Sequence, residues 1–169
     1  MSLLRSNFSP PAWLLSPHVQ SVLSSSPLRA LRARQRLTRV DARHAPMLVD
    51  AGDGVRLHGV HSVPAGVDPR GLVLLLHGWE GSVDSNYMRL TAARLLDGGF
   101  AVFRLNFRDH GDSHHLNEGI FHSNRIDEVV DAVRAIAARW PTRPLFAAGY
   151  SLGGNFALRL ALRAHSPGL

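Results

Sequence analysis

The clearest pattern of hydrophobic and polar positions lies between Asn124 and Trp140. Apolar residues recur there at helical spacing on one face, and charged residues take the other face. This pattern predicts an amphipathic helix over Asn124–Trp140. A second helix is predicted between an N-cap signal at Asp84–Asn86 and a stop signal at Gly98-Gly99. A third, over Leu152–Ala164, is apolar nearly all round and therefore needs cover on most sides.

Short apolar runs between these helices predict strands that are buried on both faces. These runs are Leu72–Leu76, Phe100–Phe107 and Leu145–Ala148. Upstream, two runs near Leu37–Arg43 and Val55–His61 flank an Asp-Gly turn signal and predict an antiparallel hairpin. The order is then hairpin, strand, helix, strand, helix, strand, helix. This alternation predicts an α/β fold, with a mostly parallel sheet and flanking helices.

The N-terminal segment has a different character, because it is rich in Ser and Pro and only weakly periodic. We expect an irregular arm over residues 1–36, with one short helix around His18–Leu23, and the α/β domain over residues 37–169. Six arginines lie between Arg29 and Arg43, in a stretch without aromatic residues for base stacking. A solvated surface segment is the expectation there, ahead of an acidic partner, a membrane surface or a nucleic acid.

Composition changes this picture little. The 169 residues carry a formal charge of +6, and every basic residue is arginine, a skew typical of genomic base composition rather than of nucleic-acid binding. Cysteine is absent, which excludes disulfides and thiolate catalysis. No apolar run approaches the about 18–20 residues of a membrane span, and no secretory signal is recognisable. A cytoplasmic location is therefore expected.

The most specific chemical signal is Gly149-Tyr150-Ser151-Leu152-Gly153, a G-x-S-x-G motif between a predicted strand and a predicted helix. A tight turn of this kind lifts the Ser151 hydroxyl above the sheet, while its glycines avoid side-chain clashes. The helix N-terminus favours developing negative charge, and the N–H of Leu152 would donate to a substrate oxyanion. An ordinary turn is the alternative, which the strand before and the helix after disfavour.

A second motif, His77-Gly78-Trp79-Glu80-Gly81, directly follows Leu72–Leu76. An H-G-x-x-G turn there supplies a second oxyanion donor, the N–H of Trp79, and Gly78 allows close approach of the main chain to a substrate. We expect His77 to orient the turn and not to transfer a proton. The alternative is a glycine-rich turn without function. Parallel neighbouring strands end at the same sheet edge, so the two motifs are expected to meet.

Together these motifs resemble the α/β-hydrolase superfamily. Within it, the likeness is closest to the bacterial YheT-type hydrolases, their animal α/β-hydrolase-domain relatives and the yeast medium-chain ester synthases/esterases. Ser16–Ser21, Leu105–Ser113 and Gly149–Asn155 carry this resemblance with His77–Gly81. The resemblance implies Ser151 as nucleophile, an oxyanion hole from the N–H groups of Trp79 and Leu152, hydrolysis of short- to medium-chain acyl esters, and no cofactor or metal.

The chain departs from this pattern in its catalytic triad. Such hydrolases need a Ser, an acid and a His in that order. The eighteen residues after Ser151 contain no Asp or Glu, and their single histidine, His165, is expected at the far end of a helix, about 20 Å away. The family sheet has the order 1-2-4-3-5-6-7-8. We therefore expect the N-terminal half of a hydrolase, truncated after the fifth strand, which would leave a bare apolar edge.

The polar loop Asp109–His122 is the one place before Ser151 that offers a surrogate base. Its imidazoles and carboxylates would also suit a metal, but the spacing fits no helical ligand pair and no H-E-x-x-H is present. We expect Asp109 and His110 to line the site with His77, Gly78 and Tyr150. The alternative function is a catalytically inactive module that pairs its open sheet edge with a partner chain or with itself.

Overall fold

Five strands form a single sheet in the computed structural model, which describes residues 9–24 and 26–164. The strands are β1 (Ala42–Asp50), β2 (Arg56–Pro64), β3 (Leu72–Leu76), β4 (Ala101–Leu105) and β5 (Leu145–Gly149). Their spatial order is β1-β2-β4-β3-β5, and only β2 runs against the other four. This order confirms the predicted mostly parallel α/β sheet and is the one expected for the first five strands of an α/β hydrolase.

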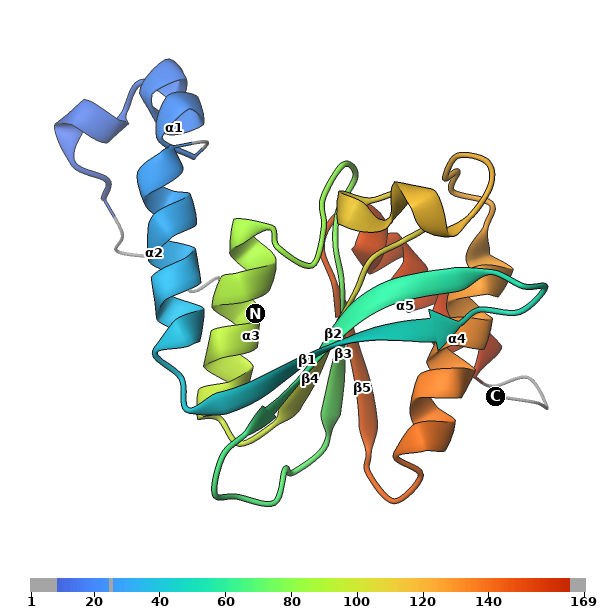
Figure 1. The fold of residues 1–169 in the computed structure, drawn as a ribbon. Helices are drawn as coiled ribbons and strands as arrows, with labels where there is room; N and C mark the ends of the chain where they lie inside the picture. Colours follow the sequence, from blue (N-terminus) through green and yellow to red (C-terminus); the bar gives the residue numbers. More distant parts are fainter. Residues whose placement is uncertain (1–8, 25, 165–169) are drawn as a thin grey trace, which may run out of the picture.

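Helices cover both faces of the sheet (Figure 1). The covering helices are α2 (Pro27–Thr38), α3 (Asn86–Asp97), α4 (Ile126–Arg139) and α5 (Leu152–Arg163). The helix α1 (Pro17–Ser24) lies beyond the end of α2, away from the sheet, and 3-10 turns stand at Ala12–Leu14 and Gly111–Leu116. The helices α2 and α3 lie on one face, and α4 and α5 on the other. The three long helices predicted from periodicity are confirmed, with ends within two residues of those expected.

The central strand β3 shows why its sequence is an unbroken apolar run. Leu72, Leu74 and Leu76 face the core under α4 and α5, whereas Val73 and Leu75 face the core under α3. All five side chains are buried. A strand covered on both faces has no position that favours a polar residue, so alternation disappears from the sequence.

The expected irregular arm is wrong over most of its described length, because it contains α2 as well as the predicted short helix, which α1 confirms. Pro27 occupies the first turn of α2, where a proline is tolerated, and the Ser26 hydroxyl accepts from the N–H of Leu28 at 3.3 Å. The strand expected over Leu37–Arg43 is also wrong, since α2 runs through Thr38 and β1 begins at Ala42. The expected boundary after residue 36 thus falls inside α2.

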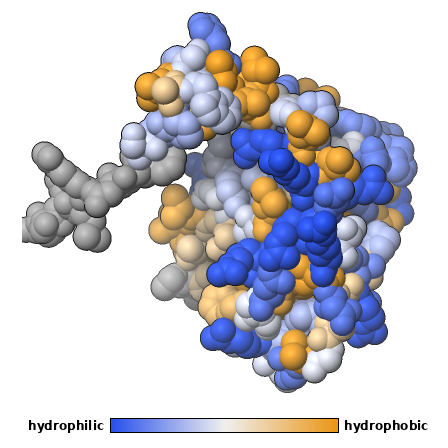
Figure 2. Space-filling view, turned by 90° about the vertical axis from the view of Figure 1, so that its left-hand side faces the viewer, coloured by the Kyte–Doolittle hydropathy of each residue, from blue (hydrophilic) through white to orange (hydrophobic). Residues whose placement is uncertain are grey.

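The arginines of α2 lie on the surface, as predicted for the stretch from Arg29 to Arg43. Ala33 and Leu37 are the buried residues of α2, so the helix packs one narrow stripe beside α3 and leaves its basic side chains outside. Figure 2 views this side of the molecule and shows a band of strongly hydrophilic surface. Arg36 forms an ion pair with Asp97 of α3.

The strand β5 lies at one edge of the sheet and pairs only with β3 among the described strands. Phe146, Ala147 and Ala148 are exposed, so the prediction of a strand buried on both faces is wrong for β5, and the prediction of an apolar edge is confirmed. Within the described residues, no helix is long and apolar enough to cross a membrane.

Candidate active site

Ser151 stands in the turn between β5 and α5, with φ +50° and ψ −113°. This backbone conformation is strained for a residue with a side chain, and such strain costs on the order of 1–3 kcal/mol. Its side chain is exposed. The G-x-S-x-G sequence therefore forms the sharp strand-to-helix turn that the motif predicts, with the serine held in a conformation that an ordinary turn does not require.

The flanking glycines are needed because main chains meet closely at this turn. A methyl group on Gly149 would lie 2.2 Å from the carbonyl of Gly153, and one on Gly153 would lie 2.3 Å from the carbonyl oxygen of Leu76. These glycines let the start of α5 rest directly on the end of β3. The N–H of Tyr150 completes the junction by donating to the carbonyl oxygen of Leu76 at 3.1 Å.

The turn after β3 lies against the serine turn, as expected for two motifs at one sheet edge. A Cβ atom on Gly78 would lie 3.5 Å from the Cβ atom of Ser151. The N–H of Gly78 donates to the Tyr87 hydroxyl at 3.0 Å, and the N–H of Gly81 donates to the carbonyl of Gly78 at 3.0 Å. The structure thus brings the H-G-x-x-G and G-x-S-x-G motifs together.

Two main-chain donors of this junction stay unused. Within the described part of the chain, neither the N–H of Trp79 nor that of Leu152 takes part in a hydrogen bond. The Leu152 N–H belongs to the first residue of α5, where helix geometry offers no internal acceptor.

His77 is fully buried beneath this junction. Its Nδ1–H donates to the carbonyl oxygen of Gly78 at 2.7 Å, and its Nε2 accepts from the N–H of Phe107 at 3.1 Å. Burial lowers the pKa of His77 to about 4, against the raising effect of the hydrogen bond to Gly78, and the nearby His110 lowers it further. His77 is therefore neutral at pH 7, and both ring nitrogens hold main chain in place.

The loop after β4 is tied down by its own polar groups. The His110 Nδ1 donates to the Arg108 carbonyl at 2.8 Å, and the His114 Nδ1 lies 2.6 Å from the Asp109 carboxylate. Arg108 is buried and pairs with Glu128 of α4 at 2.8 Å. These bonds fix the shape of the loop across the strand ends.

This loop and the turn after β3 enclose a cavity of about 550 Å³. Asp109 and His110 line it together with Trp79, whose exposed ring packs edge-on against Phe121 at 6.1 Å, whereas Ser151 is not among its lining residues. Tyr150 does not line this cavity. Its hydroxyl instead bonds the Thr91 hydroxyl of α3. His77 and Gly78, which directly follow β3, do not line this cavity either.

No partner that would activate the serine is in place. Across residues 9–24 and 26–164, no hydrogen bond joins the Ser151 hydroxyl to an imidazole or carboxylate. His165 lies outside the described residues. The same described ranges contain no group of three or more His, Cys, Asp or Glu side chains that could hold a metal ion.

Sequence reasoning missed Tyr87. Its hydroxyl accepts from the N–H of Gly78, and its ring lies 4.6 Å from that of Tyr150, so it connects the first turn of α3 to both motifs. No motif marks this tyrosine. The available signal was only its place at the start of a helix that follows the H-G-x-x-G turn.

A mostly parallel sheet of this order, with a strained serine between β5 and the next helix, is the arrangement of an α/β hydrolase. The family described as serine aminopeptidase, S33, matches residues 67–168. The chain therefore belongs to this α/β-hydrolase family.

Solved structures of esterases share this fold. Esterase Pf2001 of Pyrococcus furiosus is 23% identical, with a TM-score of 0.60 over 74% of this chain and 45% of its own. An α/β serine hydrolase without lid from Xanthomonas campestris is 27% identical, with a TM-score of 0.57 over 71% of this chain and 56% of its own. A Pyrobaculum calidifontis esterase is 19% identical, with a TM-score of 0.65 over 91% and 54%.

This chain thus spans about half the length of these solved proteins. No curated protein sequence matched it.

Proposed function

We propose that this chain carries the nucleophile and the oxyanion hole of a serine carboxylic-ester hydrolase of the YheT-type branch, acting on short- to medium-chain acyl esters. The observation that supports this most directly is the backbone of Ser151, held at φ +50° beside the Gly78 turn. A strained serine against two unused main-chain donors is suited to attack on a carbonyl group.

In the proposed reaction, the Ser151 oxygen attacks the ester carbonyl carbon. The N–H groups of Trp79 and Leu152 hold the resulting oxyanion, and each such donor contributes roughly 3 kcal/mol in comparable sites. The ester C–O bond then breaks, and the alcohol leaves with the proton that came from the serine. Water attacks the acyl-enzyme, which releases the carboxylic acid and restores Ser151.

The serine proton needs a base, and we propose that the acid and the histidine come from a further part of the fold, beyond β5. Two observations support this. The β5 edge is apolar and exposed, and the chain covers only about half of each esterase it matches. The cavity of about 550 Å³ at Trp79 is the proposed entrance for the small ester.

The test is hydrolysis of p-nitrophenyl esters of increasing acyl length by the protein isolated from its source cells. Ser151→Ala is expected to reduce kcat by at least 10³-fold, because the acyl-enzyme no longer forms. Ser123→Ala, at an exposed loop serine, serves as the matched control and should retain full activity. Equal activity of the two variants would remove Ser151 from the mechanism.

The exposed β5 edge favours a second candidate, an inactive hydrolase-like module that pairs through this edge with itself or a partner chain. Phe146 is 49% exposed on β5, and Leu158 and Leu162 of α5 are 70% and 76% exposed. Edge strands of this kind recruit further strands. Sedimentation equilibrium that shows a dimer, lost in Phe146→Lys, with no hydrolysis by the folded protein, would favour this candidate.

A further inference from the structure

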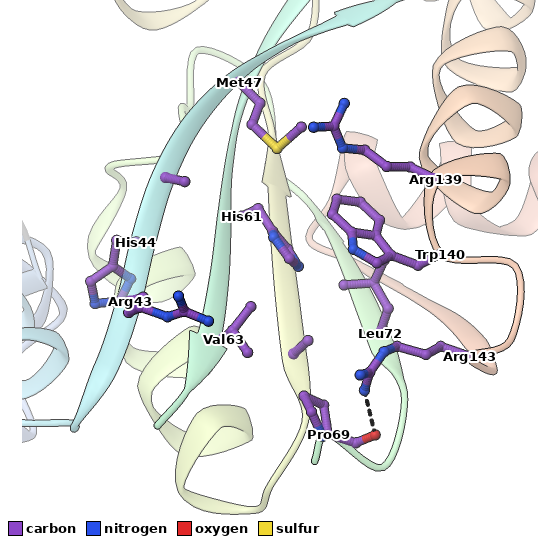
Figure 3. Close-up of a pocket in the computed structure, with 12 residues that line it drawn as sticks. Arg43, His44, Met47, His61, Val63, Pro69, Leu72, Arg139, Trp140 and Arg143 are labelled. Atoms are coloured by element: carbon purple, nitrogen blue, oxygen red, sulfur yellow. Dashed lines mark hydrogen bonds between the residues drawn. The ribbon is translucent and has the colours of Figure 1, made fainter. Parts of the chain in front are cut away.

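A second cavity, of about 830 Å³, lies at the opposite end of the sheet from Ser151 (Figure 3). Its wall includes Leu72, the first residue of β3, whereas the serine turn rests on Leu76, the last. The remaining wall comes from β1, β2, the end of α4 with the turn that follows, Pro69 before β3 and Ala101 at the start of β4. Since β1 and β2 lie at the far edge from β5, strands added to β5 would leave this cavity open.

The interior of this cavity is apolar and partly aromatic. Met47, Val63, Leu72 and Trp140 supply hydrocarbon and ring surface. The centre of the His61 ring lies 4.1 Å from that of the Trp140 ring, and Figure 3 shows the two rings next to each other in the cavity wall. Such a surface suits the apolar body of a small molecule.

The charged side chains that line this cavity are all cationic. Arg43, Arg139 and Arg143 line the cavity, and no acidic side chain of the described residues does. Arg143 pairs with Asp68 at 2.7 Å. Arg43 and Arg139 have no carboxylate partner among the residues that the structure places, and the Arg139 guanidinium lies 5.8 Å over the Trp140 ring. Figure 3 shows these two guanidinium groups at different ends of the cavity, with Arg139 beside Met47 and Trp140, so Arg139 can meet an anion at the apolar wall.

His61 in this wall adds no charge at neutral pH. Burial first, and then the guanidinium groups of Arg139 and Arg143, lower the pKa of His61 to about 4. Neutral imidazole both donates and accepts hydrogen bonds. The cavity therefore combines cations that have no carboxylate partner among the described residues, the hydrogen-bonding rings of His61 and His44, and an apolar interior.

We propose that this cavity binds an amphipathic organic anion, with its carboxylate or phosphate head on Arg139 and its apolar body against Trp140, Leu72 and Met47. Arginine forks match both head groups in a bidentate manner, which favours them over a lone halide. The size of the cavity is that of sites for drug-sized ligands. The site is separate from the proposed catalytic turn and does not depend on it.

The test is titration calorimetry of the intact chain with octanoate, octyl phosphate and octanamide, the last a neutral match in shape. At least one anion should bind tenfold more tightly than octanamide. It should shift the Trp140 indole N–H resonance in ¹H–¹⁵N spectra. Its affinity should fall at least tenfold in Arg139→Gln. Arg134→Gln, which removes the same charge from α4 outside the cavity, should change affinity less than twofold.

Arg139 is exposed and has no carboxylate partner among the described residues, so we expect Arg139→Gln to fold, which its circular dichroism verifies. Equal affinity for octanamide and both anions, or unchanged binding in Arg139→Gln, would overturn the proposal. An anion that leaves the Trp140 indole unshifted would also overturn it, since that ligand would then occupy another site. Ser151→Ala should leave binding unchanged, which separates this cavity from the proposed active site.

Discussion

Two adjacent glycines of α5 should respond oppositely to the same substitution. A Cβ atom on Gly153 would lie 2.3 Å from the carbonyl oxygen of Leu76 and 2.5 Å from that of His77, and backbone atoms cannot move aside cheaply. Overpacking of this kind costs roughly 1–3 kcal/mol or more, whereas alanine in place of glycine within a helix gains about 1 kcal/mol. Because the contacts are about 1 Å too short, the clash dominates.

We therefore expect Gly153→Ala to lower the free energy of unfolding by about 2 kcal/mol or more, a decrease in Tm of about 4–8 °C for a chain of this size. Gly154→Ala is the matched control. A Cβ atom on Gly154 would lie 3.3 Å from its nearest neighbour, the carbonyl oxygen of Gly149, and a small shift accommodates this contact. The helix gain of about 0.5–1 kcal/mol should then leave its stability unchanged or slightly raised.

Thermal and urea denaturation followed by circular dichroism measure both variants. A Gly153→Ala protein as stable as Gly154→Ala would refute the reasoning that α5 rests directly on the end of β3. It would then also remove the structural explanation of why Ser151 is held in its strained conformation.

Three further outcomes are expected. Tyr87→Phe removes the acceptor of the Gly78 N–H, so stability should fall by about 1 kcal/mol, and p-nitrophenyl ester hydrolysis should slow. Burial lowers the pKa of His77 to about 4 in the folded chain, against about 6.5 for an unperturbed histidine, so between these pH values the unfolded chain binds the extra proton. The contribution of His77 to the free energy of unfolding is complete above pH 6.5 and falls by on the order of 3 kcal/mol as the pH drops to 4. In His77→Gln, the free energy of unfolding measured in urea should therefore depend less on pH. Glu128→Gln leaves the buried Arg108 without its carboxylate, which should cost about 3 kcal/mol in urea unfolding.

Matched variants separate these effects from general disturbance. Tyr150→Phe removes a neighbouring phenol that bonds Thr91 and not the main chain of the turn, so its hydrolysis rate should stay closer to wild type. Asp131→Asn breaks an exposed pair with Arg134 on the same helix as Glu128, and should cost under about 1 kcal/mol. If each control matched its test variant, the specific contacts assigned to Tyr87 and Glu128 would be wrong.

Elements with strong local signals were predictable from the sequence. The run Leu72–Leu76 is apolar at every position because β3 is covered on both faces, and α4 shows its buried stripe at helical spacing. The serine turn was predictable because backbone geometry demands glycine at Gly149 and Gly153. Such requirements leave a mark on the sequence itself.

The features that could not be predicted depend on contacts between residues far apart in the sequence, or on residue types that occur in more than one kind of structure. The Ser- and Pro-rich composition of the N-terminal segment predicts an irregular arm, although Pro27 starts α2 behind the Ser26 cap, so composition alone is misleading there. The exposure of β5 depends on which strands pair with it, and an apolar sequence does not indicate whether a strand lies at the edge or in the middle of a sheet. The second cavity assembles Arg43 and Arg139 from segments almost a hundred residues apart, with no shared motif.

The most direct test of the central claim is fluorophosphonate labelling of the protein isolated from its source cells, with mass-spectrometric mapping of the modified residue. The account predicts a single label on the peptide that carries Ser151, abolished in Ser151→Ala and retained in Ser123→Ala. A folded protein that takes up no label, or a label on any other serine, would contradict the assignment of Ser151 as an activated nucleophile.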